Sequence, residues 1–168
     1  ALAHYQKKIY IWGEQGIGDQ IMFMGLAKEA QQLCNSLTIM VDERIRSICA
    51  RSIPNIDFIS TIRELDGIDF DYQLPIGSLP RLFRKNEIDF KKSEIGYLKA
   101  DQKYVKHLKN NLNISKPLVG ISWASFNCIS SDKKSIELAR LQKVLTKFNC
   151  DVINLQLINN VIYPVFAK

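Results

Sequence analysis

The chain has 168 residues, of which 46% are hydrophobic and 24% charged, close to the averages for a globular protein. This composition excludes a collagen-like, low-complexity or wholly disordered chain, and no apolar run approaches the ~18 residues that a membrane-spanning helix needs. The first residues lack the basic-then-apolar order of a secretory signal, so we expect a cytoplasmic protein without a membrane span. The length allows one domain, or one domain and part of another.

The net charge of +6 is unevenly distributed along the sequence. Residues 1–80 carry 7 Lys and Arg against 10 Asp and Glu, whereas residues 81–168 carry 16 against 7. A basic half is compatible with an anionic ligand. Its lysines are scattered, without an Arg-rich arm or interleaved aromatics, so we expect a solvated face and no nucleic-acid partner. A nucleic-acid-binding domain is a rival hypothesis, which predicts a steep loss of affinity with salt.

The cysteines give no sign of a metal site. They lie far apart, without a Cys-x-x-Cys pair, and His4 and His107 are the only histidines. We therefore expect no metal and reduced, buried thiols in a cytosolic protein. The cysteines are Cys34, Cys49, Cys128 and Cys150.

Apolar, β-rich runs alternate with helical patterns in the first two thirds of the chain. Helices are predicted at 19–34, at 42–50 with Asp42 as N-cap, after the loop at 77–80, and at 101–111. Strands are predicted at residues 8–12, 37–41, 56–59 and 70–74. The alternation favours a Rossmann-like α/β fold with a parallel sheet and flanking helices.

The last third of the chain repeats this alternation once. Strong apolar runs predict strands at 118–123 and 152–155, and Ser135 is expected to cap a helix that extends to about 148. The tail at 161–166 is apolar, but its proline argues against a central strand.

The most informative segment is residues 12–20, WGEQGIGDQ, between the first strand and the first helix. Glycines there allow a ligand to approach the backbone, and the helix start offers free N–H groups. The spacing G-x-x-G-x-G is not the dinucleotide fingerprint, and no Gly-Lys-Ser/Thr follows, so both an NAD site and a P-loop are disfavoured. From spacing alone, Asp19 is either a helix cap or a general base. Glu14 is either a solvated loop carboxylate or a site residue.

The same segment resembles the opening motif of the glycosyltransferase-like domain that follows tetratricopeptide repeats in many bacterial proteins. That domain is similar to the heptosyltransferases of lipopolysaccharide synthesis and, more distantly, to the O-linked N-acetylglucosamine transferases. Further matches come in the family's order, at 69–80 (DFDYQLPIGSLP), 96–100 (GYLKA), 119–125 (VGISWAS), 134–138 (KSIEL) and 154–156 (NLQ).

The resemblance implies a GT-B architecture, in which two Rossmann-like domains face a cleft. Residues 1–113 would form the acceptor-side domain, and residues 114–168 the first strand–helix–strand unit of the nucleotide-binding domain. Asp19 matches the proposed catalytic base of an inverting, metal-independent transfer from a nucleotide-sugar, with no other cofactor, to an envelope glycan or a protein.

The resemblance also implies binding residues on both sides of the cleft. Substrate would contact the loop residues Glu14, Gln15, Gly16 and Gly18. Trp123 and Lys134 would lie on the donor-diphosphate side, where a lysine can offset the charge of the leaving group. Ser125 is interpreted as an ordinary loop serine.

Two departures from the family pattern matter. A complete GT-B enzyme is longer than this chain, and the family usually continues with Tyr-Gly-Asp after the position of Gln156, where this sequence reads LINNVIYP. We therefore expect a truncated second domain that is inactive alone. The alternative is a non-catalytic Rossmann-like module for binding or assembly, with a homodimer formed through exposed sheet edges.

Overall fold

A computed structural model describes residues 7–91, 96–112, 114–124, 134–158 and 161–162. The chain divides into two compact units, residues 1–105 and 106–168. This division lies upstream of the boundary expected between 113 and 114.

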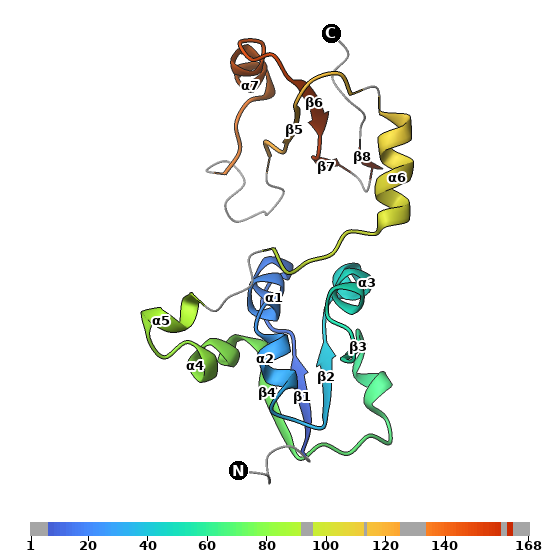
Figure 1. The fold of residues 1–168 in the computed structure, drawn as a ribbon, viewed down its shortest axis with the longest axis vertical. Coiled ribbons are helices and arrows are strands. Elements are labelled where there is room, and N and C mark those ends of the chain that lie inside the picture. Colours follow the sequence, from blue (N-terminus) through green and yellow to red (C-terminus); the bar gives the residue numbers. More distant parts are fainter. Residues whose placement is uncertain (1–6, 92–95, 113, 125–133, 159–160, 163–168) are drawn as a thin grey trace. The chain divides into compact units, whose positions relative to one another are not determined.

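The first unit contains a four-stranded, all-parallel sheet with the strand order β3-β2-β1-β4 (Figure 1). The sheet and its flanking helices confirm the expected parallel α/β architecture and are consistent with a Rossmann-like fold. The strands lie close to their predicted positions: β1 (Lys8–Trp12), β2 (Ser36–Met40), β3 (Asp57–Ile59) and β4 (Tyr72–Pro75).

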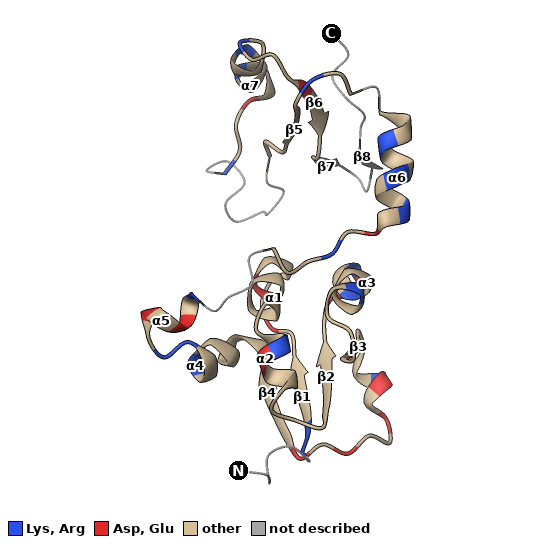
Figure 2. Ribbon diagram, viewed as in Figure 1, with Lys and Arg blue, Asp and Glu red and all other residues tan. Residues whose placement is uncertain are grey.

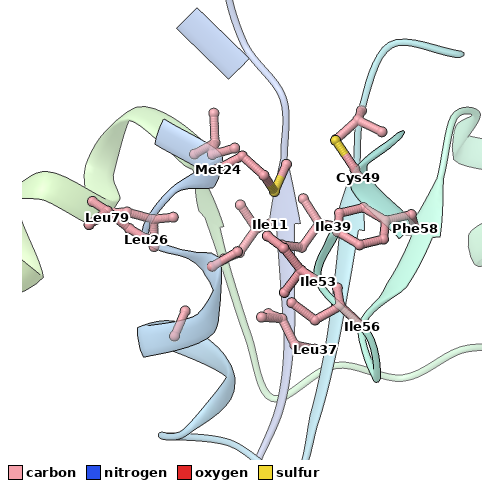
Figure 3. Packing of buried hydrophobic residues seen from close by; sticks show 14 of the residues in the cluster. Ile11, Met24, Leu26, Leu37, Ile39, Cys49, Ile53, Ile56, Phe58 and Leu79 are labelled. Carbon is pink, nitrogen blue, oxygen red and sulfur yellow. The ribbon is translucent and has the colours of Figure 1, made fainter. Parts of the chain in front are cut away.

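The core of this unit lies between the sheet and the helices that follow β1 and β2. Ile11 of β1 is in register with Ile39 of β2, and both side chains are fully buried. Met24 and Cys49 pack into the same cluster from the helices (Figure 3). Each such side chain contributes about 1.5–3 kcal/mol through burial. The helices are α1 (Ile17–Met24), α2 (Ala27–Gln31) and α3 (Glu43–Ser52).

Asp42 is confirmed as the N-cap of α3. Its carboxylate accepts the Arg44 backbone N–H at 3.0 Å and also hydrogen-bonds the Arg44 guanidinium. These bonds lower the pKa of Asp42 to about 2. The helix extends beyond the predicted end and stops at Ser52.

The single helix predicted at 19–34 is wrong, because two shorter helices meet at Gly25 and Leu26. Glycine is a poor helix former. In addition, the hydroxyl of Tyr97 donates a hydrogen bond to the carbonyl of Ile21, which a continuous helix would pair with the N–H of Gly25. A residue far along the chain thus replaces a helical hydrogen bond.

Short helices complete the first unit after β3 and β4. The guanidinium of Arg84, whose side chain is 3% exposed, donates to both carboxylate oxygens of Glu29 and ties the segment after α4 to α2. These helices are η2 (Ile62–Leu65), η3 (Ile76–Ser78), α4 (Leu79–Phe83) and α5 (Glu87–Phe90).

The division between the units falls within α6 (Gln102–Asn111), close to the helix predicted at 101–111. In the second unit, β5 (Leu118–Ile121) pairs in parallel with β6 (Asp151–Asn154), and α7 (Leu138–Leu145) lies between them in sequence. The expected strand–helix–strand unit is therefore present.

Two details differ at the end of the chain. The helix expected to be capped by Ser135 begins only at Leu138, with Glu137 at the N-cap position, so that prediction is wrong. In the tail, β7 (Leu157–Ile158) and β8 (Val161–Ile162) form a short antiparallel pair.

The two units differ sharply in net charge. Residues 1–105 carry 14 Lys and Arg and 14 Asp and Glu, whereas residues 106–168 carry 9 and 3. The first unit is therefore neutral, and the second accounts for the whole +6. Figure 2 shows basic residues along α6 and α7.

The hydrogen bond of Tyr97 gives a test of how the α1–α2 junction is held. Burial raises the pKa of Tyr97 to about 12. In the unfolded chain a tyrosine ionises near pH 10, so this group's stabilisation is complete below pH 10 and is lost as the pH rises toward 12. We expect the free energy of unfolding in urea to fall over this range.

Tyr97→Phe removes the hydroxyl and should cost about 1 kcal/mol at pH 8. It should also flatten the fall in stability above pH 10. A variant with the same pH dependence as the wild type would contradict this role for Tyr97.

Candidate functional site

The candidate site lies where the strand order of the first sheet reverses. From β1 the chain proceeds to β2 and β3 on one side, and then returns to place β4 on the other side of β1 (Figure 1). In open parallel sheets, the loops on either side of such a switch point separate at the carboxyl ends of the strands and leave room for a ligand. Here those loops are residues 13–16 and the η3 turn.

A buried glutamine fixes the first of these loops. The side chain of Gln20 is 7% exposed, and its Oε1 accepts the backbone N–H of Asp42 at 2.9 Å. Its amide lies flat against Gly13, where an added β-carbon would be 2.8 Å from Cδ. The N–H of Gly13 in turn donates to the carbonyl of Met40 at 2.8 Å. A side chain at position 13 would therefore have to displace the Gln20 amide.

Asp19 lies in the first turn of α1, immediately before Gln20. Its Oδ2 accepts the backbone N–H of Gly16, the N-cap residue, at 3.2 Å. Asp19 thus has the capping role that its spacing allows. The contact engages one oxygen, and the half-buried carboxylate keeps further acceptor capacity.

Gly18 leaves open space beside the first turn of α1. A β-carbon at Gly18 would meet nothing within 4 Å. The first backbone N–H groups of a helix, here those of residues 17–19, have no acceptor within the helix itself. Donors at the start of α1 and the carboxylate of Asp19 therefore share one end of the helix.

Glu14 links the two loops. Its carboxylate lies against Gly77 of η3, so close that a β-carbon at position 77 would overlap its Oε1. Among the described residues, this half-buried carboxylate has no hydrogen-bond donor. Gln15, the next residue, has a φ of 62°, a left-handed conformation that is uncommon for a residue other than glycine. Such strain is concentrated at functional sites.

The structure thus brings together five of the seven residues singled out from the sequence. They belong to one loop and one helical turn at the carboxyl end of β1: Glu14, Gln15, Gly16, Gly18 and Asp19. The arrangement offers carboxylate acceptors beside backbone and amide donors. It can bind hydroxyl groups and accept a proton from one of them.

The other two residues, Trp123 and Lys134, belong to the second unit. The carbonyl of Trp123, just beyond β5, accepts the backbone N–H of Ile136 at 2.8 Å. This bond brings the segment that carries the exposed Lys134 to the carboxyl end of β5. Ser125 lies outside the described residues.

A second buried glutamine, Gln156, fixes the loop after β5. Its Oε1 accepts the Ser122 hydroxyl and the backbone N–H groups of Trp123 and Ala124 at 2.9–3.0 Å, and its Nε2 donates to the carbonyl of Ala124 at 3.0 Å. This contact gives a structural reason for the glutamine of the NLQ segment.

Sequence reasoning missed Gln20 as a site residue. Its signal was available, because a polar residue on the apolar face of a predicted helix, shortly after a glycine-rich loop, indicates a buried hydrogen bond. Its partner at Asp42 could not be read from the sequence.

Neither metal-binding groups nor membrane helices were found within the described ranges. No group of three or more His, Cys, Asp and Glu residues there could hold a metal ion. No helix there is long and apolar enough to cross a membrane. Cys49 is buried, Cys34 and Cys150 are half-buried, and Cys128 lies outside the described ranges. Burial raises the pKa of the Cys34 and Cys49 thiols.

Substitution of the loop glycines tests this geometry. Gly13→Ala should destabilise the protein by about 1–3 kcal/mol, because the new methyl group displaces the Gln20 amide from the Asp42 N–H. Urea unfolding measures the change. Gly18→Ala is the matched control, and the open space at Gly18 predicts a neutral or slightly stabilising effect. Equal effects of the two variants would contradict the described packing.

Comparison with models of protein families, with curated proteins and with solved structures found no match to this chain. The geometry of the site and the sequence motifs are therefore the basis for its interpretation.

Proposed function

We propose that the carboxyl edge of the first unit is the acceptor side of a glycosyltransferase of the GT-B class, related to the heptosyltransferases. The donor is a nucleotide-sugar, and the acceptor is an envelope glycan or a protein. One observation carries the proposal: Asp19 and the glycine-rich loop lie together at the switch point between β1 and β4. The ordered series of motifs in the sequence adds to it.

In the proposed reaction, an acceptor hydroxyl lies within reach of the Asp19 carboxylate. The hydroxyl oxygen attacks the anomeric carbon of the donor and forms the new C–O bond, while the bond from that carbon to the diphosphate oxygen breaks. Asp19 takes the hydroxyl proton, and the configuration at the anomeric carbon inverts. Lys134 offsets charge on the departing nucleoside diphosphate.

The cap formed by Asp19 and its proposed role as a base can be separated by substitution. Asparagine keeps an oxygen that can accept the Gly16 N–H, but it cannot serve as a base. In the full product of the gene, we expect Asp19→Asn to lower kcat by about 10²–10⁴-fold with little loss of stability. Asp19→Ala should lower kcat similarly and also cost about 1 kcal/mol in stability. Retention of kcat by Asp19→Asn would contradict the assignment.

The donor side is tested by calorimetric titration of the 168-residue chain with UDP-, GDP- and ADP-sugars. The described strands of the second unit form two separate pairs, so we propose that this chain does not turn over substrate alone. Saturable binding that Lys134→Ala weakens would identify a donor site in residues 106–168. Transfer by the chain itself, abolished in Asp19→Asn, would contradict its inactivity.

A second candidate function, a module for assembly, is favoured by the surface of β5. This strand has an apolar sequence, yet Leu118 is 42% and Val119 37% exposed. Among the described residues, β5 pairs with β6 alone. An uncovered apolar strand can pair with a second copy of the chain.

This candidate predicts a homodimer. Size exclusion with light scattering should give twice the mass of the chain, and Val119→Lys should return the protein to a monomer because a charge opposes burial. A wild-type monomer at high micromolar concentration would exclude assembly through β5.

A further inference from the structure

The amide nitrogen of Gln20, at the switch point, is a hydrogen-bond donor without an acceptor among the described residues. The Asp42 N–H can be accepted only by the amide oxygen, so the two ends of the Gln20 amide cannot be interchanged. The Nε2 group, with two N–H donors, then lies over Gly13. Among the described residues, it has no hydrogen-bond acceptor. A donor in a side chain that is 93% buried normally has a partner.

This donor remains reachable from solvent. Ser60 Oγ is the single side-chain polar atom, among the described residues, that is fully buried without a partner. The Gln20 Nε2 also lacks a partner but is not one of these fully buried atoms, so part of its surface is accessible to solvent. The Asp42 bond and the contact with Gly13 set the position of this donor.

The charges around it limit the kind of ligand. Residues 12–24 and 72–80, which flank the switch point, contain the carboxylates of Glu14 and Asp19 and no Lys or Arg. At Asp42, which Gln20 contacts, the guanidinium of Arg44 is paired with the Asp42 carboxylate. Two carboxylates without a cation repel a phosphate or a carboxylate ligand. They accept hydrogen bonds from hydroxyl groups, and a hydroxyl oxygen can in turn accept one from the Gln20 amide.

We infer that Gln20 is a ligand-binding residue whose Nε2 donates to a hydroxyl oxygen of a neutral, polyhydroxylated ligand held beside Glu14 and Asp19. The inference rests on the proposed function in identifying this ligand with the sugar acceptor. It excludes a phosphorylated group from direct contact with the β1 loop, so any anionic part of the substrates belongs elsewhere.

The wild-type chain, labelled with ¹⁵N at glutamine side chains, allows a direct test by NMR. The probes are methyl glycosides of neutral hexoses and N-acetylhexosamines, and inorganic pyrophosphate. We expect a neutral glycoside to shift the Gln20 amide signals saturably and pyrophosphate to leave them unchanged. Gln31 is the internal control, because its Nε2 already donates to the carbonyls of Pro54 and Asn55.

Gln20→Glu separates ligand binding from a structural role. Glutamate can still accept the Asp42 N–H but cannot donate, so we expect glycoside affinity to fall about tenfold in a folded protein. Gln32→Glu, at an exposed position after α2, adds the same charge away from the site and should bind as the wild type does.

Three results would overturn the inference: a Gln20 signal that no glycoside moves, one that pyrophosphate moves, or unchanged affinity in Gln20→Glu. Failure of the proposed function is distinguishable. If the full product of the gene transfers no sugar while glycosides still shift the Gln20 signals, the ligand assignment holds and the reaction does not. If the full product of the gene transfers sugar but no glycoside shifts the Gln20 signals, the proposed reaction holds and the ligand assignment does not.

Discussion

The position of β1 between β2 and β4 is the constraint on which the candidate site depends. Because β4 returns to the opposite side of β1, the loops that leave these two strands diverge over the carboxyl edge of the sheet. The glycine-rich loop follows β1, so it borders this gap. With β4 beside β3 instead, the strands β2 and β3 would separate Glu14 from Gly77. The topology therefore creates the site before any side-chain chemistry is considered.

Two buried glutamines fasten the loops at the ends of parallel strands. Gln20 connects the loop after β1 to the start of α3, and Gln156, which follows β6, holds the loop after β5. In both cases an amide oxygen accepts backbone N–H groups that no strand can pair. This solution holds a loop without charge, so the electrostatics of the ligand site are left to other residues.

The fold of the first unit was largely predictable from the sequence, because apolar runs of strand length alternate with amphipathic helices. Parallel pairing followed from strands such as 37–41 that lack alternating polarity. The strand order was not predictable, since it depends on contacts distant in sequence. The same limit applies to the helix at 19–34, where Tyr97 bonds to the carbonyl of Ile21 near the interruption, and to Ser135, whose neighbour Ile136 bonds back to Trp123.

For the candidate site, the sequence identified the loop but not the separate roles of its residues. Spacing left Asp19 open between cap and base, and the structure adds that one oxygen is engaged by Gly16. Whether Glu14 is solvated could not be known from its neighbours, because Gly77 comes from another strand. The role of Gln20 could not be assigned, because its partner, the Asp42 N–H, is brought to it only by the fold. Its importance lies in a bond to a backbone N–H, a group that every residue type except proline offers.

The division of charge between the units has a kinetic consequence. An anionic ligand is attracted over a distance of about 8–10 Å at moderate ionic strength. The second unit, which carries +6, provides such an attraction, whereas the first unit has no net charge. Under the proposed function, added salt would therefore slow the capture of an anionic donor and leave the capture of a neutral acceptor almost unchanged. The order in which the two substrates arrive would then depend on the ionic strength of the surroundings.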